Sequence, residues 1–147
     1  MDVVATLDAQ CDPSALVAVV RDLDRYPEWV SILPRSNAEA GAEPAAWSVE
    51  LRATIGPLAR SKKLRMVRVV DDADHVRFER SETDGRRHSA WVLDATVRPV
   101  DEGSRLTMSL HYGGALGGGL VERLLRDEIE SSRGRLRALV EQDVVGP

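Results

Sequence analysis

Hydrophobic and polar residues alternate with a period of two through most of this chain, which is the pattern of β-strands that bury one face. The clearest case is segment 45–55, AAWSVELRATI, where Trp47, Val49 and Leu51 are separated by polar residues. Further segments alternate in the same way: 3–9, 59–70, 75–80, 89–100 and 105–112. Short polar turns such as DDAD and DEG join them, so we expect an antiparallel sheet with one apolar face and one polar face.

The side of segment 59–70 that faces the core is ambiguous. Leu64, Met66 and Val70 favour one parity, whereas Val67 and Val69 favour the other. The choice matters because this segment is strongly basic, and its parity decides which charged side chains face inward.

A short helix is predicted between the first two strands. Asp12 is suited to the N-cap and Pro13 to the first helical position, and the apolar segment 14–24 follows. This helix must end before Pro27, because the residue before a proline disfavours the helical conformation. A second short helical turn is expected around residues 26–30.

The last part of the chain has the period of an amphipathic helix. Segment 119–142 would form a helix about 36 Å long, enough to lie across a whole sheet. Its apolar stripe comprises Val121, Leu125, Ile129, Ser132, Leu136 and either Leu139 or Val140.

The order of these elements predicts an α+β fold. We expect a helix-grip arrangement, in which a curved antiparallel sheet of about seven strands wraps around the long C-terminal helix. Two short helices follow the first strand. The 147 residues suit one domain, residues 1–147, which is large enough to build a core without covalent staples.

The composition narrows the functional classes. A net charge of −4 argues against a nucleic-acid partner, and the basic cluster 60–68 is expected to be a solvated strand face. A single cysteine, Cys11, excludes an intramolecular disulfide and fits a reducing compartment. The N-terminus lacks the pattern of a signal peptide, and no apolar run reaches the about 18 residues of a membrane span. We therefore expect a cytoplasmic protein without stable membrane insertion.

The residues that most often carry acid–base or metal chemistry are scattered. His75, His88 and His111 all fall on the polar side of their strands, and no two of them have ligand spacing. We predict no metal site and no cofactor. Cys11 has no base near it in the sequence, so we interpret it as a passive residue.

Charged residues on apolar faces are more informative. Arg68 shares the parity of Leu64 and Met66, so it faces the same side of its strand. Arg80 likewise shares the parity of the apolar residues before it in its strand. Glu128 lies close to the apolar stripe of the last helix. Unpaired buried charge is costly, so these side chains either lie beyond the edge of the core or line a polar spot in a cavity. In a cavity, an Arg–Glu pair would orient a carbonyl, carboxylate or phenol.

The glycine run 113–120, GGALGGGL, is not a phosphate loop, because no lysine and hydroxyl residue follow it and no βαβ unit surrounds it. Two interpretations stay open. The run is either a simple joint between the last strand and the helix, or a lid over an apolar cavity. The lid residues would be Gly114, Leu116, Gly117, Gly118 and Leu120.

The stretch DLDRYPEWV, after a helix that opens DPSALVAVV, resembles the START-like or Bet v 1-like helix-grip superfamily (SRPBCC), in its polyketide cyclase/dehydrase and lipid-transport branch. Asp22, Tyr26, Pro27 and Trp29 match the motif of that branch. The resemblance extends over the full length, and the ending is similar to that of small actinobacterial members, some linked to toxin–antitoxin pairs. It implies a cavity between sheet and terminal helix, opening near the glycine run.

Three functions follow from the residues and the resemblance. The first is a carrier or binding protein for a hydrophobic molecule, such as a lipid, an isoprenoid or a polyketide-like compound. The second is a cofactor-free polyketide aromatase/cyclase or dehydratase, in which Arg68 polarises a carbonyl and Tyr112 or Glu128 moves protons. Arg68 matches an arginine of the cyclases, but the aromatic and serine partners upstream of it are replaced here. The third is an interaction protein, such as a toxin–antitoxin partner. Monomer and homodimer both stay open.

The inward-facing positions define the residues expected to contact a ligand. They are Val49, Leu51, Leu64, Met66, Arg68, Phe78, Arg80, Trp91, Leu93, Met108, Leu110, Tyr112, Leu125, Glu128 and Ile129. Tyr26 and Trp29 are expected to anchor the short second helix to the sheet, with a second role as one wall of the cavity mouth.

Overall fold

A computed structural model describes residues 1–55, 57–114 and 119–145. Its seven strands form a single sheet, and every pair of neighbouring strands is antiparallel. In chain order the elements are β1 (Asp2–Ala9), α1 (Pro13–Val20), the 3₁₀-helix η1 (Leu23–Glu28), β2 (Arg35–Ala38), β3 (Ala46–Ile55), β4 (Leu58–Asp71), β5 (His75–Arg80), β6 (Trp91–Val100), β7 (Gly103–Tyr112) and α2 (Gly119–Val145). The predicted α+β helix-grip fold is confirmed.

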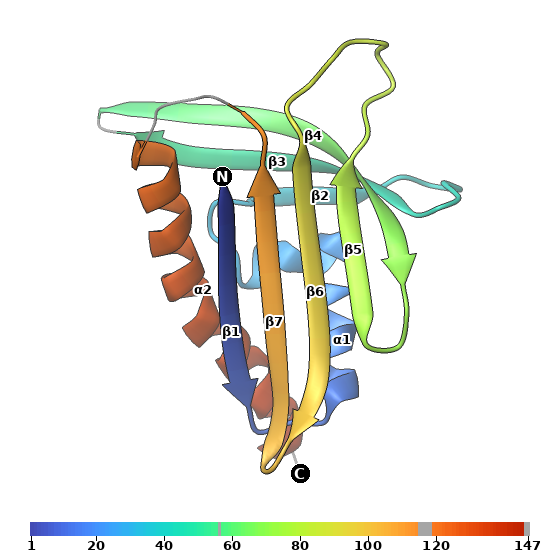
Figure 1. The fold of residues 1–147 in the computed structure, drawn as a ribbon, viewed down its shortest axis with the longest axis vertical. Helices are drawn as coiled ribbons and strands as arrows, with labels where there is room; N and C mark the ends of the chain where they lie inside the picture. Colours follow the sequence, from blue (N-terminus) through green and yellow to red (C-terminus); the bar gives the residue numbers. More distant parts are fainter. Residues whose placement is uncertain (56, 115–118, 146–147) are drawn as a thin grey trace.

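The strand order β1-β7-β6-β5-β4-β3-β2 follows from hairpins between consecutive strands and one long return that places β1 beside β7. Figure 1 shows the result: β3 and β4 run across the top of the view, over the ends of β1, β7 and β6, so the sheet is strongly curved. Both α-helices lie on the same, concave side of it. This face therefore carries the apolar residues of the alternating strands, and the opposite face is polar.

The parity of β4 that Leu64 and Met66 favour is the one that faces the core, since both residues are buried. Val69, which favours the other parity, is 47% exposed. The pairing with β5 shifts by one residue between Arg68 and Val70, which is a β-bulge. Beyond the bulge Val70 pairs with Arg77, the neighbour of the buried Val76, so Val70 no longer follows the inward parity.

The first helix is shorter than predicted. It ends at Val20 rather than near Asp24, because Asp22 is extended with φ −116° and ψ 114°. The chain then turns into η1, which contains Pro27 and is the expected second short helical element, beginning at Leu23 rather than at Tyr26. Asp12 does occupy the N-cap with an extended backbone, but its side chain makes no capping hydrogen bond.

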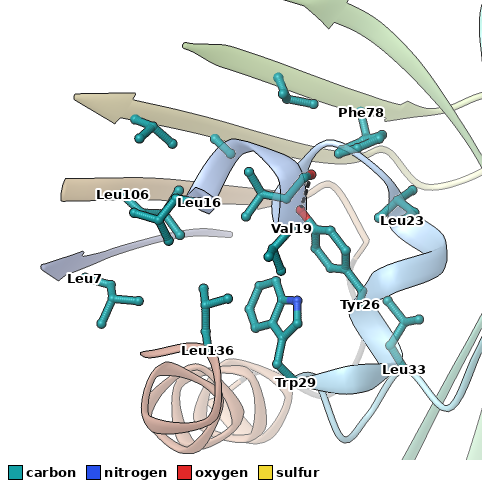
Figure 2. Packing of buried hydrophobic residues seen from close by; sticks show 14 of the residues in the cluster. Leu7, Leu16, Val19, Leu23, Tyr26, Trp29, Leu33, Phe78, Leu106 and Leu136 are labelled. Atoms are coloured by element: carbon teal, nitrogen blue, oxygen red, sulfur yellow. Dashed lines mark hydrogen bonds between the residues drawn. The ribbon is translucent and has the colours of Figure 1, made fainter. Parts of the chain in front are cut away.

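The core lies between the sheet and the helices, and η1 contributes aromatic residues to it (Figure 2). Tyr26 and Trp29 are both buried, with ring centroids 4.8 Å apart. Tyr26 also makes an edge contact with Phe78 of β5 at 6.3 Å, and its hydroxyl donates a hydrogen bond to the Val20 carbonyl at 2.9 Å. These contacts hold η1 against the sheet, as expected from the aromatic pair.

The long helix α2 covers one side of the concave face. Its buried residues, Leu125, Ser132, Leu136 and Val140, lie on the predicted stripe. No helix within the described residues is both long and apolar enough to cross a bilayer.

Gly103, the first residue of β7, provides a test of how closely the sheet packs on the chain after β1. A Cβ built on Gly103 would overlap the Ala9 carbonyl oxygen and lie 3.1 Å from the Gln10 Cα. These are backbone atoms, which cannot move aside without disturbing the sheet. We therefore expect Gly103→Ala to lower the free energy of unfolding by about 1–3 kcal/mol, measured by urea denaturation.

Gly134 in α2 is the matched control, because a Cβ built there has nothing within 4 Å. Replacing a glycine in an exposed helical position by alanine stabilises a helix by up to about 1 kcal/mol. Gly134→Ala should therefore raise the free energy of unfolding. Equal effects of the two substitutions would contradict the packing described for Gly103.

Candidate functional site

The sheet, η1 and α2 surround a partly open cavity of about 170 Å³. Its walls come from β1, β3, β4, β6, β7, the segment 23–33 and the middle of α2, residues 125–136. Most of the lining side chains are aliphatic or aromatic, and the polar ones are Thr6, Ser109, Glu128, Ser132 and Arg133. An engineered cavity of about 150 Å³ with a similar lining stays free of water and binds benzene, so a space of this size suits a molecule of one or two rings.

Most of the residues predicted to contact a ligand line this cavity. They are Val49, Leu51, Leu64, Met66, Trp91, Leu93, Met108, Leu110, Leu125, Glu128 and Ile129. They come from four strands and α2, so the alternation along the strands and the stripe of the helix identified the same space.

Four predicted residues do not line the cavity: Arg68, Phe78, Arg80 and Tyr112. Phe78 is fully buried under Tyr26 and Trp47, where it makes edge contacts with both rings. The Arg80 side chain is 7% exposed, but its Nε donates to Glu82 at 2.9 Å and its Nη1 to the Ser89 carbonyl at 3.3 Å. Both are on the inner face, as predicted, but neighbouring elements cover them.

Arg68 also faces inward, since it pairs with Phe78 across β4 and β5, yet the end of α1 covers it. Its Nη1 donates to the Arg21 carbonyl at 2.6 Å and to Asp22 at 3.0 Å. Its guanidinium lies 5.2 Å from the centre of the Trp47 ring. Arg68 therefore joins β4 to the α1–η1 junction and is not among the residues that line the cavity.

Glu128 is the acidic residue of the cavity wall, and both of its oxygens are engaged. Ser31 donates to them from its backbone N–H and from its hydroxyl, each at 2.6 Å. Arg135 donates to Glu128 at 3.1 Å and, through Nε, to the Trp29 carbonyl at 2.9 Å. This network, which we call the α2 clamp, holds the chain after η1 against α2.

Tyr112 is the last residue of β7, and it does not line the cavity. Its ring lies on Trp91 with centroids 4.5 Å apart, and Lys62 Nζ lies 5.9 Å from its centre. Burial, together with the charge of Arg80, lowers the pKa of Lys62. A Cβ built on Gly114 would overlap the outer end of the Tyr112 ring, so a side chain there would require the ring to shift.

The lid interpretation stays a prediction. Of its residues, Leu116, Gly117 and Gly118 lie outside the described part of the chain, and so does the side chain of Leu120. Only Gly114 is placed, next to Tyr112.

The three residues proposed for cyclase chemistry are not brought together. Arg68 binds the α1–η1 junction, Tyr112 packs on Trp91, and Glu128 binds Ser31 and Arg135. No hydrogen bond joins any two of them within residues 1–55, 57–114 and 119–145.

The histidines and Cys11 do not line the cavity. His75 contacts Asp94 at 2.6 Å and His111 contacts Asp2 at 2.8 Å, whereas His88 lies in the loop before β6 and not on a strand as predicted. Burial raises the pKa of the Cys11 thiol, which keeps it protonated and a poor nucleophile. Among the described residues, no three metal-binding side chains form a cluster.

Sequence reasoning missed part of the cavity wall. The additional lining residues include Val3 and Leu7 of β1, Leu23 of η1, Ile32 and Leu33 after it, and Ser132, Arg133 and Leu136 of α2. The alternation of β1 was a usable signal for Val3 and Leu7. Tyr26 and Trp29 also line the cavity, in agreement with the second role expected for them.

Comparison with protein families identifies one match over nearly the whole chain. A family described as polyketide cyclase / dehydrase and lipid transport matches residues 1–141. No curated protein matches the sequence significantly.

Solved structures share the fold. TTHA0849 from Thermus thermophilus superposes with a TM-score of 0.77 at 17% identity, over 97% of this chain and 99% of that protein. The Zhui aromatase/cyclase from Streptomyces sp. R1128 superposes with a TM-score of 0.72 at 12% identity, over 98% of this chain and 95% of that protein. A START superfamily protein from Mycobacterium smegmatis superposes with a TM-score of 0.70 at 15% identity, over 96% of this chain and 97% of that protein. At such identities the likeness establishes the fold and not the activity.

The position of Arg68 leads to a test of its role. We expect Arg68→Met, which keeps much of the side-chain volume, to lower the free energy of unfolding by about 1–2 kcal/mol, because the partly buried Arg21 carbonyl loses a charged donor. Urea denaturation measures this change. Arg60→Met on the exposed part of the same strand is the control and should have little effect. A normal stability of Arg68→Met would contradict the structural role.

Proposed function

The chain belongs to the polyketide cyclase / dehydrase and lipid transport family, and from this premise we propose that it binds a hydrophobic small molecule in the cavity, as a carrier or binding protein. The observation that carries the proposal is the lining of the cavity, whose exposed surface is almost entirely apolar. Burying apolar surface there is worth roughly 25 cal/mol per Å², so the cavity favours a hydrophobic occupant without further chemistry.

The volume points to the size of the occupant. A space of about 170 Å³ suits a compact ring system rather than an extended acyl chain. Among the ligand classes considered from the sequence, this favours a polyketide-like or cyclic isoprenoid compound over a long-chain lipid. The segment 23–33 and α2, which form two walls, are held to each other by the α2 clamp, and this supports a cavity of defined size.

The two alternative functions have less support. The cyclase alternative needs a polar group at a bound carbonyl, and the residues assigned to that task are committed to other contacts. The interaction alternative needs an apolar surface for a partner. The exposed large hydrophobic residues of the described chain, Val4 and Val69, lie on strands at different positions in the sheet and form no common patch.

Naphthalene provides a direct test, because it has two fused rings and no polar group. We expect saturable 1:1 binding in isothermal titration calorimetry. Leu93→Trp should weaken it at least about tenfold, because the larger side chain enters the cavity from β6.

Val92→Trp is the matched control, because Val92 is the preceding residue of β6 and does not line the cavity. It should leave naphthalene binding unchanged. Non-saturable binding, or equal binding by the two tryptophan variants when both are folded, would contradict the proposal.

The natural ligand is accessible by native mass spectrometry of the protein purified from its own host. We expect a population with the added mass of a small apolar molecule, which organic extraction removes. A protein that never carries such a mass, and that host lipid extracts do not stabilise against heat, would count against a carrier.

A further inference from the structure

Lysine is rare in this chain, whereas arginine is common. The sequence contains two lysines, Lys62 and Lys63, among its 20 basic residues. They are adjacent in β4, so their side chains point to opposite faces of the sheet. Lys62 lies opposite Leu51 and precedes Leu64 by two residues, and both leucines line the cavity. Lys62 therefore faces inward at the edge of the cavity, whereas Lys63 faces outward and is exposed.

The surroundings of the Lys62 amine come from β5, β6 and β7. The strand β4 passes over the end of β7 (Figure 1), and Lys62 Nζ lies 5.9 Å from the centre of the Tyr112 ring. That ring packs on Trp91, which lines the cavity. Arg80, at the end of β5, and Glu82, just after it, are the charged residues that act on the amine. Lys62 is half-buried, so its amine is only partly solvated.

The positive charge of Lys62 is not neutralised by direct contact. Among the described residues, the amine forms no ion pair and no hydrogen bond. The Glu82 carboxylate is already bound, since it accepts from Arg80 Nε at 2.9 Å and from the Arg65 backbone N–H at 3.2 Å. Burial and the positive charge of Arg80 lower the pKa of Lys62. More of the neutral amine, which is the nucleophile, is therefore present at a given pH.

The choice of lysine at this position has a chemical consequence. Arg68 and Arg80, which also face inward, are bound to acceptors of the protein. A guanidinium stays protonated and is not a nucleophile, whereas an amine can lose its proton and attack a carbonyl. A lysine beside an apolar site and a second cation is the arrangement that activates an amine for this reaction.

We propose that Lys62 is a carbonyl-reactive amine, which forms an imine with an apolar aldehyde held at the edge of the cavity. The Nζ atom attacks the carbonyl carbon, and a C=N bond replaces the C=O bond. The carbonyl oxygen leaves as water with the two hydrogens of the amine, so no oxidant or reductant is needed. The inference rests on the proposed function, because the cavity holds the apolar part of the aldehyde, and it adds a covalent site to it.

The test traps the imine formed with 2-naphthaldehyde, whose rings are those of naphthalene. Sodium cyanoborohydride delivers a hydride to the C=N bond and leaves a stable secondary amine. Cleavage after arginine and tandem mass spectrometry then locate the naphthylmethyl group. We expect it on Lys62 at least about tenfold more often than on Lys63, because the cavity raises the local concentration of the aldehyde at Lys62 alone.

Three variants provide the controls. Lys62→Arg keeps the positive charge and cannot form an imine, so it should lose the label and still bind naphthalene, since Lys62 does not line the cavity. Lys63→Arg is the matched control and should keep the label on Lys62. Leu93→Trp, which fills the cavity, should lose the preference of 2-naphthaldehyde for Lys62. Reductive methylation of Lys62 by formaldehyde, which does not need the cavity, should be unchanged in Leu93→Trp.

The outcomes separate the two proposals. If Lys62 and Lys63 are labelled equally while naphthalene binds, the imine assignment is overturned and the proposed function stands. If 2-naphthaldehyde still prefers Lys62 in Leu93→Trp, the assignment is also overturned, because the aldehyde then reaches the amine without the cavity. If naphthalene does not bind and neither lysine is preferred, both proposals are overturned.

Discussion

The curvature of the sheet is the constraint on which the rest of this structure depends. A seven-stranded sheet that bends over itself presents more concave apolar surface than one helix can cover. The helix α2 covers one side, and α1 with η1 covers the other. The space left between them is the cavity, so it is a consequence of how the layers meet. The α2 clamp, from Ser31 through Glu128 to Arg135 and Trp29, fixes the distance at which they meet.

The charged residues of the inner face show how the cavity stays apolar. Arg68 is covered by the end of α1, Arg80 is bound to Glu82, and Glu128 is bound to Ser31. Each of these charges near the core thereby has a partner within the protein, as the cost of burying unpaired charge requires. These groups tie elements together at the margins of the cavity and leave its interior to aliphatic and aromatic side chains.

Periodicity was sufficient to predict the fold and most of the cavity wall, because both depend on which residues share a face. It failed for Arg68: the parity was correct, but whether an inward side chain meets a cavity or a covering helix is a tertiary property. The end of α1 at Val20 also depends on tertiary contacts, such as the bond from Tyr26 to the Val20 carbonyl. The bulge in β4, which takes Val70 off the inward parity, could not be predicted from any residue in the sequence.

The tryptophans illustrate why fold and function separate in this family. Trp29 and Trp47 have similar surroundings in the sequence, each beside apolar residues and near an acidic one. The fold brings Asp24 to Trp47 and, within the described chain, brings no acceptor to Trp29 or Trp91. Whether a helix-grip protein is a catalyst or a binding protein depends on which polar groups converge in its cavity, and the fold alone does not decide it. In this chain the groups assigned to catalysis are bound elsewhere.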